Sequence, residues 1–364
     1  MEVIHDFSGS FEVAKKAVDG TVYLDHTPVN VNRNDHNILY SGVFANTDEI
    51  DMDWDVPNAD SGSETWTRVP YTGITEQAVI TAENALALTV GTWLSGTTGA
   101  ELSVIGAVQE NEGGAAEKLG LLDMPFIFEK GFRQVNFTVF NGETLMGALL
   151  DISETINGTC GGSARFEGTA DDQTGDFSGT FRFNNYCEEN IIVNGQGEIT
   201  GIIDLFSEEL VFYHYAFTGM TVSFGNQSFT LDGRVRVSYL SSPPFMVLSY
   251  VYTDNTVSYW LKDLIIDIVE GLDYVDITDV MGRYYDPAYG YTEIELEEPI
   301  RIYNDGFWPA SGKFLLVGAV GNQGGSTKAS LEFLSETSFL VEADTDGDGA
   351  YDDYSSGIQL WSEQ

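Results

Sequence analysis

The chain has 364 residues, enough for one large domain or two ordinary ones, and its 43% hydrophobic content is that of a globular protein. Its 57 acidic residues outnumber 16 basic residues, which gives a net charge of −41. This balance argues against nucleic acid and against anionic membrane surfaces as partners, because both are bound through basic clusters. An acidic surface of this kind attracts divalent cations and repels itself at low salt.

Residues 1–134 are predicted to form an N-terminal region of mixed β and α structure. Strand-like segments broken by Asn, Asp and Pro come first. A helix is predicted over about residues 81–96, because Thr81 suits an N-cap and apolar residues follow at helical spacing. A second helix is predicted over about residues 115–132.

Residues 135–364 are predicted to form an antiparallel β domain, because strand-like runs follow one another at short spacing without helical patterns between them. A sheet this long must curl, split into the two layers of a sandwich, or wrap into a half-barrel, and the sequence leaves these three open. The expected fold is therefore mainly β, a long antiparallel meander with one or two short helices in the N-terminal third.

The stretch from Cys160 to Cys187 reads as one symmetric β-hairpin with its turn at residues 172–175. In that register Cys160 faces Cys187. Side chains alternate along a strand, so this register sorts apolar from polar residues onto two faces. The apolar face pairs Ala164 with Phe183, Phe166 with Phe181 and Ala170 with Phe177. The pairing predicts a Cys160–Cys187 disulfide, with two reduced, buried cysteines as the alternative.

The Gly168/Gly179 pair of this hairpin leaves a gap in its apolar face, and we expect a neighbouring aromatic side chain to fill it. A paired cysteine geometry favours an oxidising compartment, either extracellular or periplasmic. Residues Met1–Val3 lack the features of a signal peptide, so we expect a chain whose leader segment has been removed. No apolar run approaches the ~20 residues of a membrane span.

An aspartate-rich loop near the C-terminus, residues 344–355, resembles the opening of a calcium-binding loop. It has carboxylates at positions 1, 3 and 5 and Gly349 at position 6, but Ser355 replaces the glutamate of an EF-hand at position 12. Its flanks look like strands, so the loop is expected to cap a β-hairpin. Hard oxygen ligands favour calcium, the predicted cofactor, or magnesium; the alternative is an acidic turn without metal. The predicted ligands are Asp344, Asp346, Asp348, the backbone carbonyl of Ala350, Asp352 and Asp353.

Catalytic signals are weak throughout the sequence. The four histidines form no zinc-binding spacing, and neither a GxSxG nor a phosphate-binding glycine motif occurs. With 57 acidic residues, the sequence offers no way to select the carboxylate pair of a glycosidase. No catalytic residue is predicted.

Aromatic residues gather around two turns in the C-terminal half of the chain. Aromatic rings on loops can stack on sugar rings, which makes a glycan platform one interpretation; core packing or cross-strand pairing is the other. The candidate ligand-binding aromatics are Tyr285, Tyr289, Tyr291 and Trp308.

Three stretches together resemble a family of uncharacterised secreted or lipid-anchored proteins of Gram-negative bacteria. They are residues 80–88, residues 158–194 with Thr-Cys-Gly-Gly and Asn-Asn-Tyr-Cys, and residues 308–361 with the aspartate-rich loop. The resemblance extends over about two thirds of the chain. It implies an exported, envelope-associated protein, extracellular or periplasmic and outer-membrane-associated, and brings no activity, so no catalytic residue is carried over.

These features lead to three hypotheses. The first is a non-enzymatic extracellular or cell-envelope protein for structure, adhesion or self-assembly, stiffened by the disulfide and calcium. The second is a glycan-binding or small-ligand-binding secreted module that uses the aromatic loops. The third is a secreted hydrolase of unknown type.

Overall fold

The structure is a computed structural model that describes residues 10–16, 21–24, 27–30, 37–44, 49–56, 60–67, 71–94, 128, 131–135, 149–188, 190–207, 209–224, 227–254, 256–303 and 308–361. Contacts divide the chain into two units, Met1–Pro70 and Tyr71–Gln364. The sequence prediction drew its boundary after residue 134. In the structure, residues 71–94 instead group with the long C-terminal sheet.

The first unit is built from short antiparallel strands, as the sequence predicts for this part of the chain. Four of them form a sheet in the order β1-β4-β5-β6, and β2 pairs with β3. The strands are β1 (Ser10–Lys16), β2 (Thr21–Leu24), β3 (Thr27–Asn30), β4 (Asn37–Phe44), β5 (Glu49–Val56) and β6 (Asp60–Thr67).

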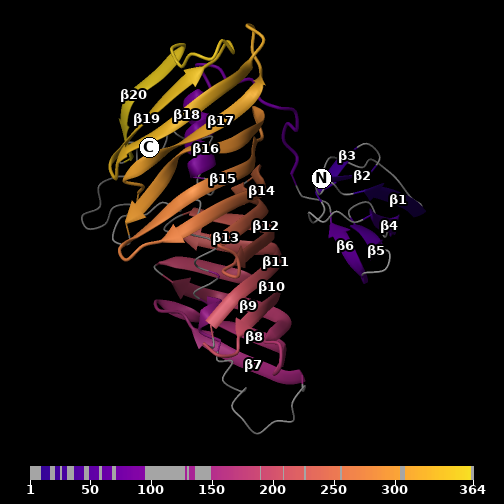
Figure 1. The fold of residues 1–364 in the computed structure, drawn as a ribbon. Coiled ribbons are helices and arrows are strands. Elements are labelled where there is room, and N and C mark those ends of the chain that lie inside the picture. Colours follow the sequence, from indigo (N-terminus) through magenta and orange to yellow (C-terminus); the bar gives the residue numbers. More distant parts are fainter. Residues whose placement is uncertain are drawn as a thin grey trace. The chain divides into compact units, whose positions relative to one another are not determined.

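The second unit contains one 14-stranded sheet in which every strand pairs antiparallel with its neighbours in sequence, from β7 to β20 (Figure 1). The predicted long antiparallel meander is therefore confirmed. The strands are β7 (Leu149–Asn157), β8 (Gly161–Asp171), β9 (Asp176–Glu188), β10 (Ile191–Asp204), β11 (Glu209–Phe224), β12 (Gln227–Ser238), β13 (Phe245–Asp254), β14 (Val257–Glu270), β15 (Tyr274–Asp286), β16 (Gly290–Tyr303), β17 (Ser311–Val320), β18 (Ser326–Ser335), β19 (Ser338–Asp344) and β20 (Tyr354–Leu360).

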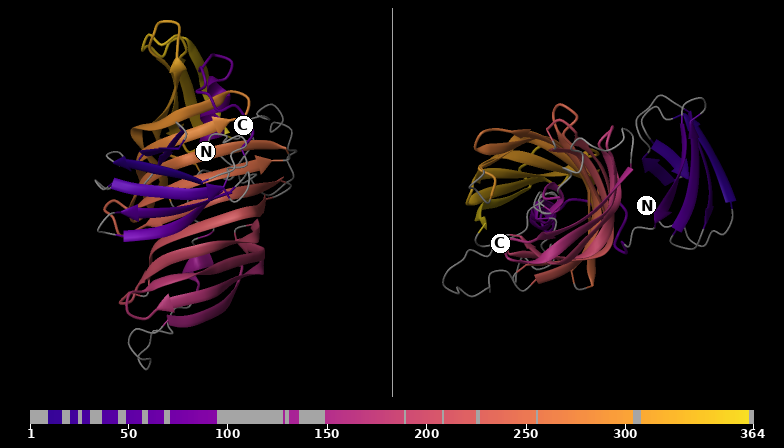
Figure 2. Two further views of the ribbon diagram at one scale, coloured as in Figure 1. Left: turned by 90° about the vertical axis from the view of Figure 1, so that its right-hand side faces the viewer. Right: turned by 90° about the horizontal axis from the view of Figure 1, so that it is seen from below.

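The sheet is a single curled layer, which decides among the three arrangements that the sequence left open (Figure 2). Burial alternates along the strands, as in β8 and β10, because successive side chains point to opposite faces. The concave face, on which α1 lies, carries the apolar core. Right-handed strand twist accumulates over 14 strands, so a flat sheet of this length is not expected.

Helix α1 (Ala85–Trp93) lies on the concave side and confirms the first predicted helix (Figure 2). Its N-cap is Asn84 rather than Thr81, because a turn precedes the helix and the Asn84 side chain accepts a hydrogen bond from the Thr81 N–H. Nearly every residue of α1 is buried, which is typical of a helix enclosed by a core. Among the described residues, no helix has the length and hydropathy needed to cross a membrane.

Different segments fill different parts of the concave face. Trp93 of α1 packs edge-on against Phe333 at the β17–β19 end. Near β8–β12, Phe128 and Phe132 insert among the sheet's aromatic rings; Phe132 lies 4.7 Å from Phe181, centroid to centroid. Residues 131–133 are helical, and the rest of the second predicted helix lies outside the described residues. Burial of these rings is the main source of stability for such a sheet.

Residues 76–80 are inserted between the ends of β16 and β17. The Tyr291 N–H donates to the carbonyl of Glu76, and the Ala78 N–H donates to the carbonyl of Tyr291. On the other side, the Ala319 N–H donates to Ala78. Gly318 permits this approach, since a Cβ there would lie 2.6 Å from the Ala78 carbonyl oxygen. The insertion leads the chain directly into α1.

The β8–β9 hairpin has the predicted register over most of its length. Ala170 pairs with Phe177, and every pair up to Ser163 and Asn184 follows the same alignment. The predicted apolar face is buried. The Phe166 ring covers the predicted gap in that face, because a Cβ built on the opposing glycines would lie within 2.8 Å of it.

At the open end of the hairpin the predicted pairing is wrong by one residue. The register shifts between Gly161 and Ser163, so that Gly161, not Cys160, lies opposite Cys187. Gly161 and Gly162 have φ values of 134° and 65°, which favour glycine and produce the bulge. The disulfide itself is confirmed, with 5.1 Å between the Cα atoms of Cys160 and Cys187.

Candidate metal centre

The aspartate-rich loop connects β19 to β20. Asp344 is the last residue of β19, and Asp353 directly precedes β20. The last ladder pair, Ala343 with Tyr354, therefore brings the two ends of the loop together. The loop caps a β-hairpin, as its strand-like flanks predict.

Backbone N–H groups of the loop converge on two of its carboxylates. One oxygen of Asp353 accepts the N–H groups of Thr345 at 2.7 Å and Asp346 at 3.1 Å. The two oxygens of Asp344 accept the N–H groups of Gly347 at 2.7 Å and Gly349 at 2.8 Å. These bonds fix the carboxylates in place. Each oxygen of Asp344 accepts one of them and retains a lone pair for a cation, while the second oxygen of Asp353 accepts none of them.

The β17–β18 turn, residues 321–325, supports the loop from outside. The Gln323 N–H donates to the carbonyl of Asp346 at 2.7 Å, and the Gly325 N–H donates to that of Gly347 at 3.1 Å. A Cβ on Gly321 or Gly325 would collide with the carbonyl oxygens of Asp346 or Gly347. Sequence reasoning missed this support, although the run Gly-Asn-Gln-Gly-Gly was a visible sign of close backbone approach.

The structure brings together three of the six predicted ligands. Carboxylate oxygens of Asp344, Asp346 and Asp353 lie within 4.8 Å of one another. Asp348 instead accepts the Ala350 N–H at 2.7 Å. The three carboxylates differ in burial, since Asp344 is fully enclosed and Asp353 is exposed. Together they form a donor set that suits a hard divalent cation.

The carboxylates of the loop differ in the way their surroundings act on them. The backbone N–H of Thr345 lowers the pKa of Asp353. Desolvation raises the pKa of Asp346, and the negative charges of Asp353, Asp348 and Asp344 raise it further. The loop thus stores like-charge repulsion around Asp346, which a bound cation would relieve.

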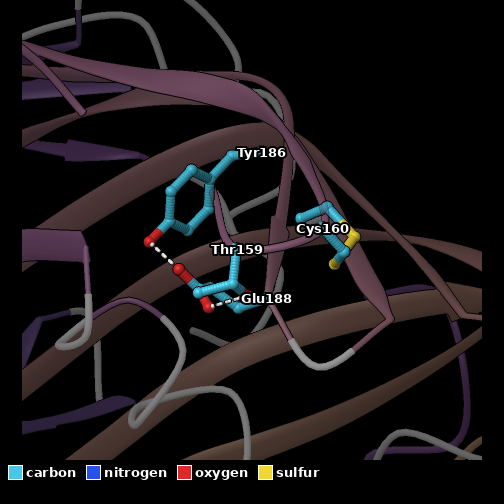
Figure 3. Close-up of a disulfide and its surroundings, with 5 residues drawn as sticks. Thr159, Cys160, Tyr186 and Glu188 are labelled. Atoms are coloured by element: carbon cyan, nitrogen blue, oxygen red, sulfur yellow. Dashed lines mark hydrogen bonds between the residues drawn. A yellow bond between two sulfur atoms is a disulfide. The ribbon is translucent and has the colours of Figure 1, made fainter. Parts of the chain in front are cut away.

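A buried carboxylate lies beside the disulfide and was not predicted (Figure 3). Glu188 is 3% exposed and accepts hydrogen bonds from the Thr159 hydroxyl at 2.6 Å and the Tyr186 hydroxyl at 2.7 Å. Burial raises its pKa, but these hydrogen bonds more than offset the effect and hold the pKa below its usual value. The unbroken buried run from Tyr186 to Glu188 departs from strand alternation, and only the tertiary partners explain it. This group ties the loop of Cys160 to β9.

The four aromatic candidates do not form one platform. Tyr285 is buried and stacks on Trp260 at 4.6 Å, while Trp308 is partly buried against the core and stacks on Trp361 at 4.4 Å. Tyr291 packs against Tyr285. Tyr289 is exposed at 41% on the β15–β16 turn.

Comparisons with protein-family models, with curated proteins and with solved structures find no match to this chain. The resemblance to exported proteins of Gram-negative bacteria therefore stays a prediction. The disulfide is the structural feature that accords with an oxidising compartment.

Proposed function

We propose that this chain is a non-enzymatic structural, adhesion or assembly protein of the extracellular space or the cell envelope, in which a disulfide and calcium brace one long sheet. One observation carries the proposal: the disulfide and the aspartate-rich loop lie near opposite ends of the sheet. The disulfide joins β9 to the residue before β8, and the aspartate-rich loop joins β19 to β20.

The positions of the braces have a physical rationale. In a meander each strand bonds only to its sequence neighbours, so strands near the ends are the least supported. Cross-linking Cys160 to Cys187 stabilises one end by about 3–4 kcal/mol in the chain-entropy account. Calcium at the Asp344 carboxylate would fix the other end. A sheet braced in this way suits an environment without chaperones or reducing agents.

The glycan-binding alternative has weaker support. Of its four candidate residues, Tyr285 and Trp308 are occupied by ring stacking with Trp260 and Trp361. Tyr289 alone among the four is exposed by more than a third of its surface.

The metal claim is tested by thermal melting of the chain in calcium and in EDTA. A cation at a hundredfold excess over its dissociation constant stabilises the folded state by about 2.7 kcal/mol, so the melting temperature should rise measurably. Asp346→Asn should abolish the calcium-dependent rise, whereas Asp352→Asn, outside the carboxylate group, should retain it. An identical melting temperature in calcium and EDTA would refute calcium as a brace.

A further inference from the structure

The antiparallel meander places alternate hairpin turns along one edge of the sheet, which we call the even rim because its turns follow β8, β10, β12, β14, β16 and β18. Backbone hydrogen bonds link neighbouring turns along it. The Ile203 N–H donates to Gly175 in the β8–β9 turn, and the Ile268 N–H donates to Pro244 in the β12–β13 loop. These bonds tie the β8–β9 turn to β10 and the β12–β13 loop to β14, the strands that lead into the next turns of the rim.

Large apolar side chains project from three successive turns of the even rim. Phe206 in the β10–β11 turn and Leu272 in the β14–β15 turn are fully exposed, and Leu240 in the β12–β13 loop is 62% exposed. Successive tips are two strands apart along the rim, which is about 9–10 Å at ordinary strand spacing. Singly exposed apolar residues are common on protein surfaces, but the two that the structure describes as fully exposed, Phe206 and Leu272, both lie on this rim.

The tips are held out from the sheet by ordered turns. One carboxylate oxygen of Asp204 accepts the N–H groups of Phe206 at 2.8 Å and Ser207 at 2.9 Å. The Gly271 N–H donates to Tyr274 at 2.8 Å and closes the turn that carries Leu272. Their exposure is thus built into the turn geometry.

The same rim carries further exposed apolar side chains, and the opposite rim carries fewer and less exposed ones. Four more lie on strand ends along the even rim: Leu149, Val269, Leu334 and Leu360. On the opposite rim, within the described part of the chain, the exposed large apolar residues are Ile74, Val79, Ile192, Tyr289 and Val320, of which Val320 is the most exposed at 65%. The aspartate-rich loop and the disulfide also lie on that side, so the two rims differ in chemistry.

The charges around the tips select the partner. The turns at residues 205–207, 239–244 and 271–273 contain no lysine or arginine, and exposed carboxylates flank them at Asp204 and Asp273. One cation does lie against the second loop, because the Arg133 guanidinium is 5.1 Å from the centroid of the Tyr239 ring; the net charge of the chain is nevertheless −41. Anionic lipid and a second copy of this acidic chain would both be repelled. The quaternary ammonium of a choline headgroup is attracted to carboxylates, while separate apolar tips enter the interfacial layer beneath it.

We propose that the tips Phe206, Leu240 and Leu272 insert into a neutral, choline-bearing lipid surface, with the neighbouring carboxylates facing the headgroups. This is a peripheral contact made by the even rim. It is independent of calcium at the aspartate-rich loop, which lies on the opposite rim.

The test is flotation of the full chain with phosphatidylcholine vesicles in EDTA, which removes calcium bridging. The chain should float with these vesicles and bind less to vesicles containing phosphatidylglycerol. The double variant Phe206→Ser with Leu272→Ser should lose at least about tenfold in vesicle partitioning, because two inserted side chains are removed. Val320→Ser, an exposed apolar residue of the opposite rim, should bind like the native chain.

Phe206→Trp provides a second readout. Its tryptophan emission should shift to shorter wavelength on addition of phosphatidylcholine, whereas the emission of Val320→Trp should not respond. Absence of flotation by the native chain, equal flotation of the double variant, or preference for anionic vesicles would each overturn the proposal. The proposal would also be overturned if the native chain self-associates, the double variant does not, and neither binds vesicles. The rim would then join copies of the chain.

Discussion

At the scale of single residues, the aspartates of the β19–β20 loop have opposite roles. Asp353 accepts three hydrogen bonds and is stabilised as a carboxylate, whereas Asp346 is surrounded by negative charge. The loop therefore contains one carboxylate that stabilises the folded chain, Asp353, and one that destabilises it, Asp346. This difference can be measured without any metal.

In EDTA we expect Asp353→Asn to lower the stability of the chain and Asp346→Asn to raise it. Asp353 has a folded-state pKa below its unfolded value, so its contribution is present above the unfolded pKa and is lost as the pH falls through the folded one. The sign for Asp346 is reversed, because its folded pKa is raised. Urea unfolding near neutral pH checks both; a change of the same sign in the two variants would contradict the assignment.

His214 makes a second pH-dependent contribution on the convex face of β11. Burial, followed by the charges of Arg234 and Arg236, lowers its pKa from 6.5 to about 4. Between these values the unfolded chain binds a proton that the folded chain does not. Stability from this group is therefore complete above pH 6.5 and decreases as the pH falls towards 4, by at most about 3 kcal/mol.

His214→Gln should remove this part of the pH dependence. In urea unfolding, the native chain should lose stability relative to the variant as the pH is lowered from about 7 to about 4.5. Comparing the two chains cancels the titration of the carboxylates. Parallel pH profiles would show that the imidazole titrates normally in the folded state.

At the scale of elements, the β8–β9 hairpin depends on close backbone contact at its glycine pair. A Cβ on Gly168 would collide with the Ser178 carbonyl oxygen and would lie 2.7 Å from the Phe166 ring. That ring cannot move away freely, because it packs against Phe177 and Phe181 in the core. The glycine is required by packing rather than by its φ angle.

Gly168→Ala should cost about 2 kcal/mol, within the range for overpacked cores. Gly131→Ala is the matched control, because its added Cβ would lie 3.5 Å from Phe183, an ordinary contact, and should change stability by less than about 0.5 kcal/mol. Urea unfolding of the two variants measures the difference. Equal stabilities would show that the hairpin can shift to admit a side chain.

At the scale of the whole molecule, the net charge of −41 opposes the folded state through self-repulsion. Raising sodium chloride from about 0.01 M to about 0.15 M shortens the Debye length from about 30 Å to about 8 Å. The melting temperature in EDTA should therefore rise with salt. Choline chloride should act equally, since screening is not specific to the cation; a flat or falling melting temperature would contradict the repulsion.

The packing of aromatic side chains against the concave face is also a property of the whole molecule. Trp93 of α1 and the ring pair Phe128 and Phe132 occupy separate parts of the curl, and both come from outside the meander. Strand alternation gives no information about which segment will cover an apolar face. The predicted helices were visible in sequence, but their place against the sheet was not.

The sequence alone determined the strand-rich class, most of the β8–β9 register and the position of the aspartate-rich loop. Period-two alternation is a local constraint, and it leaves one acceptable register wherever one face is buried. The same local logic predicted the disulfide, but it missed the bulge at Gly161 and Gly162, where positive φ angles interrupt the alternation.

Only the tertiary structure decided how the sheet is arranged and which carboxylates meet. Curling depends on twist summed over 14 strands and on what fills the concave side, so no single segment encodes it. The group of Asp344, Asp346 and Asp353 depends on a ladder pair and on a turn about twenty residues earlier in the chain. The row of Phe206, Leu240 and Leu272 likewise exists because the meander aligns turns that are far apart in sequence.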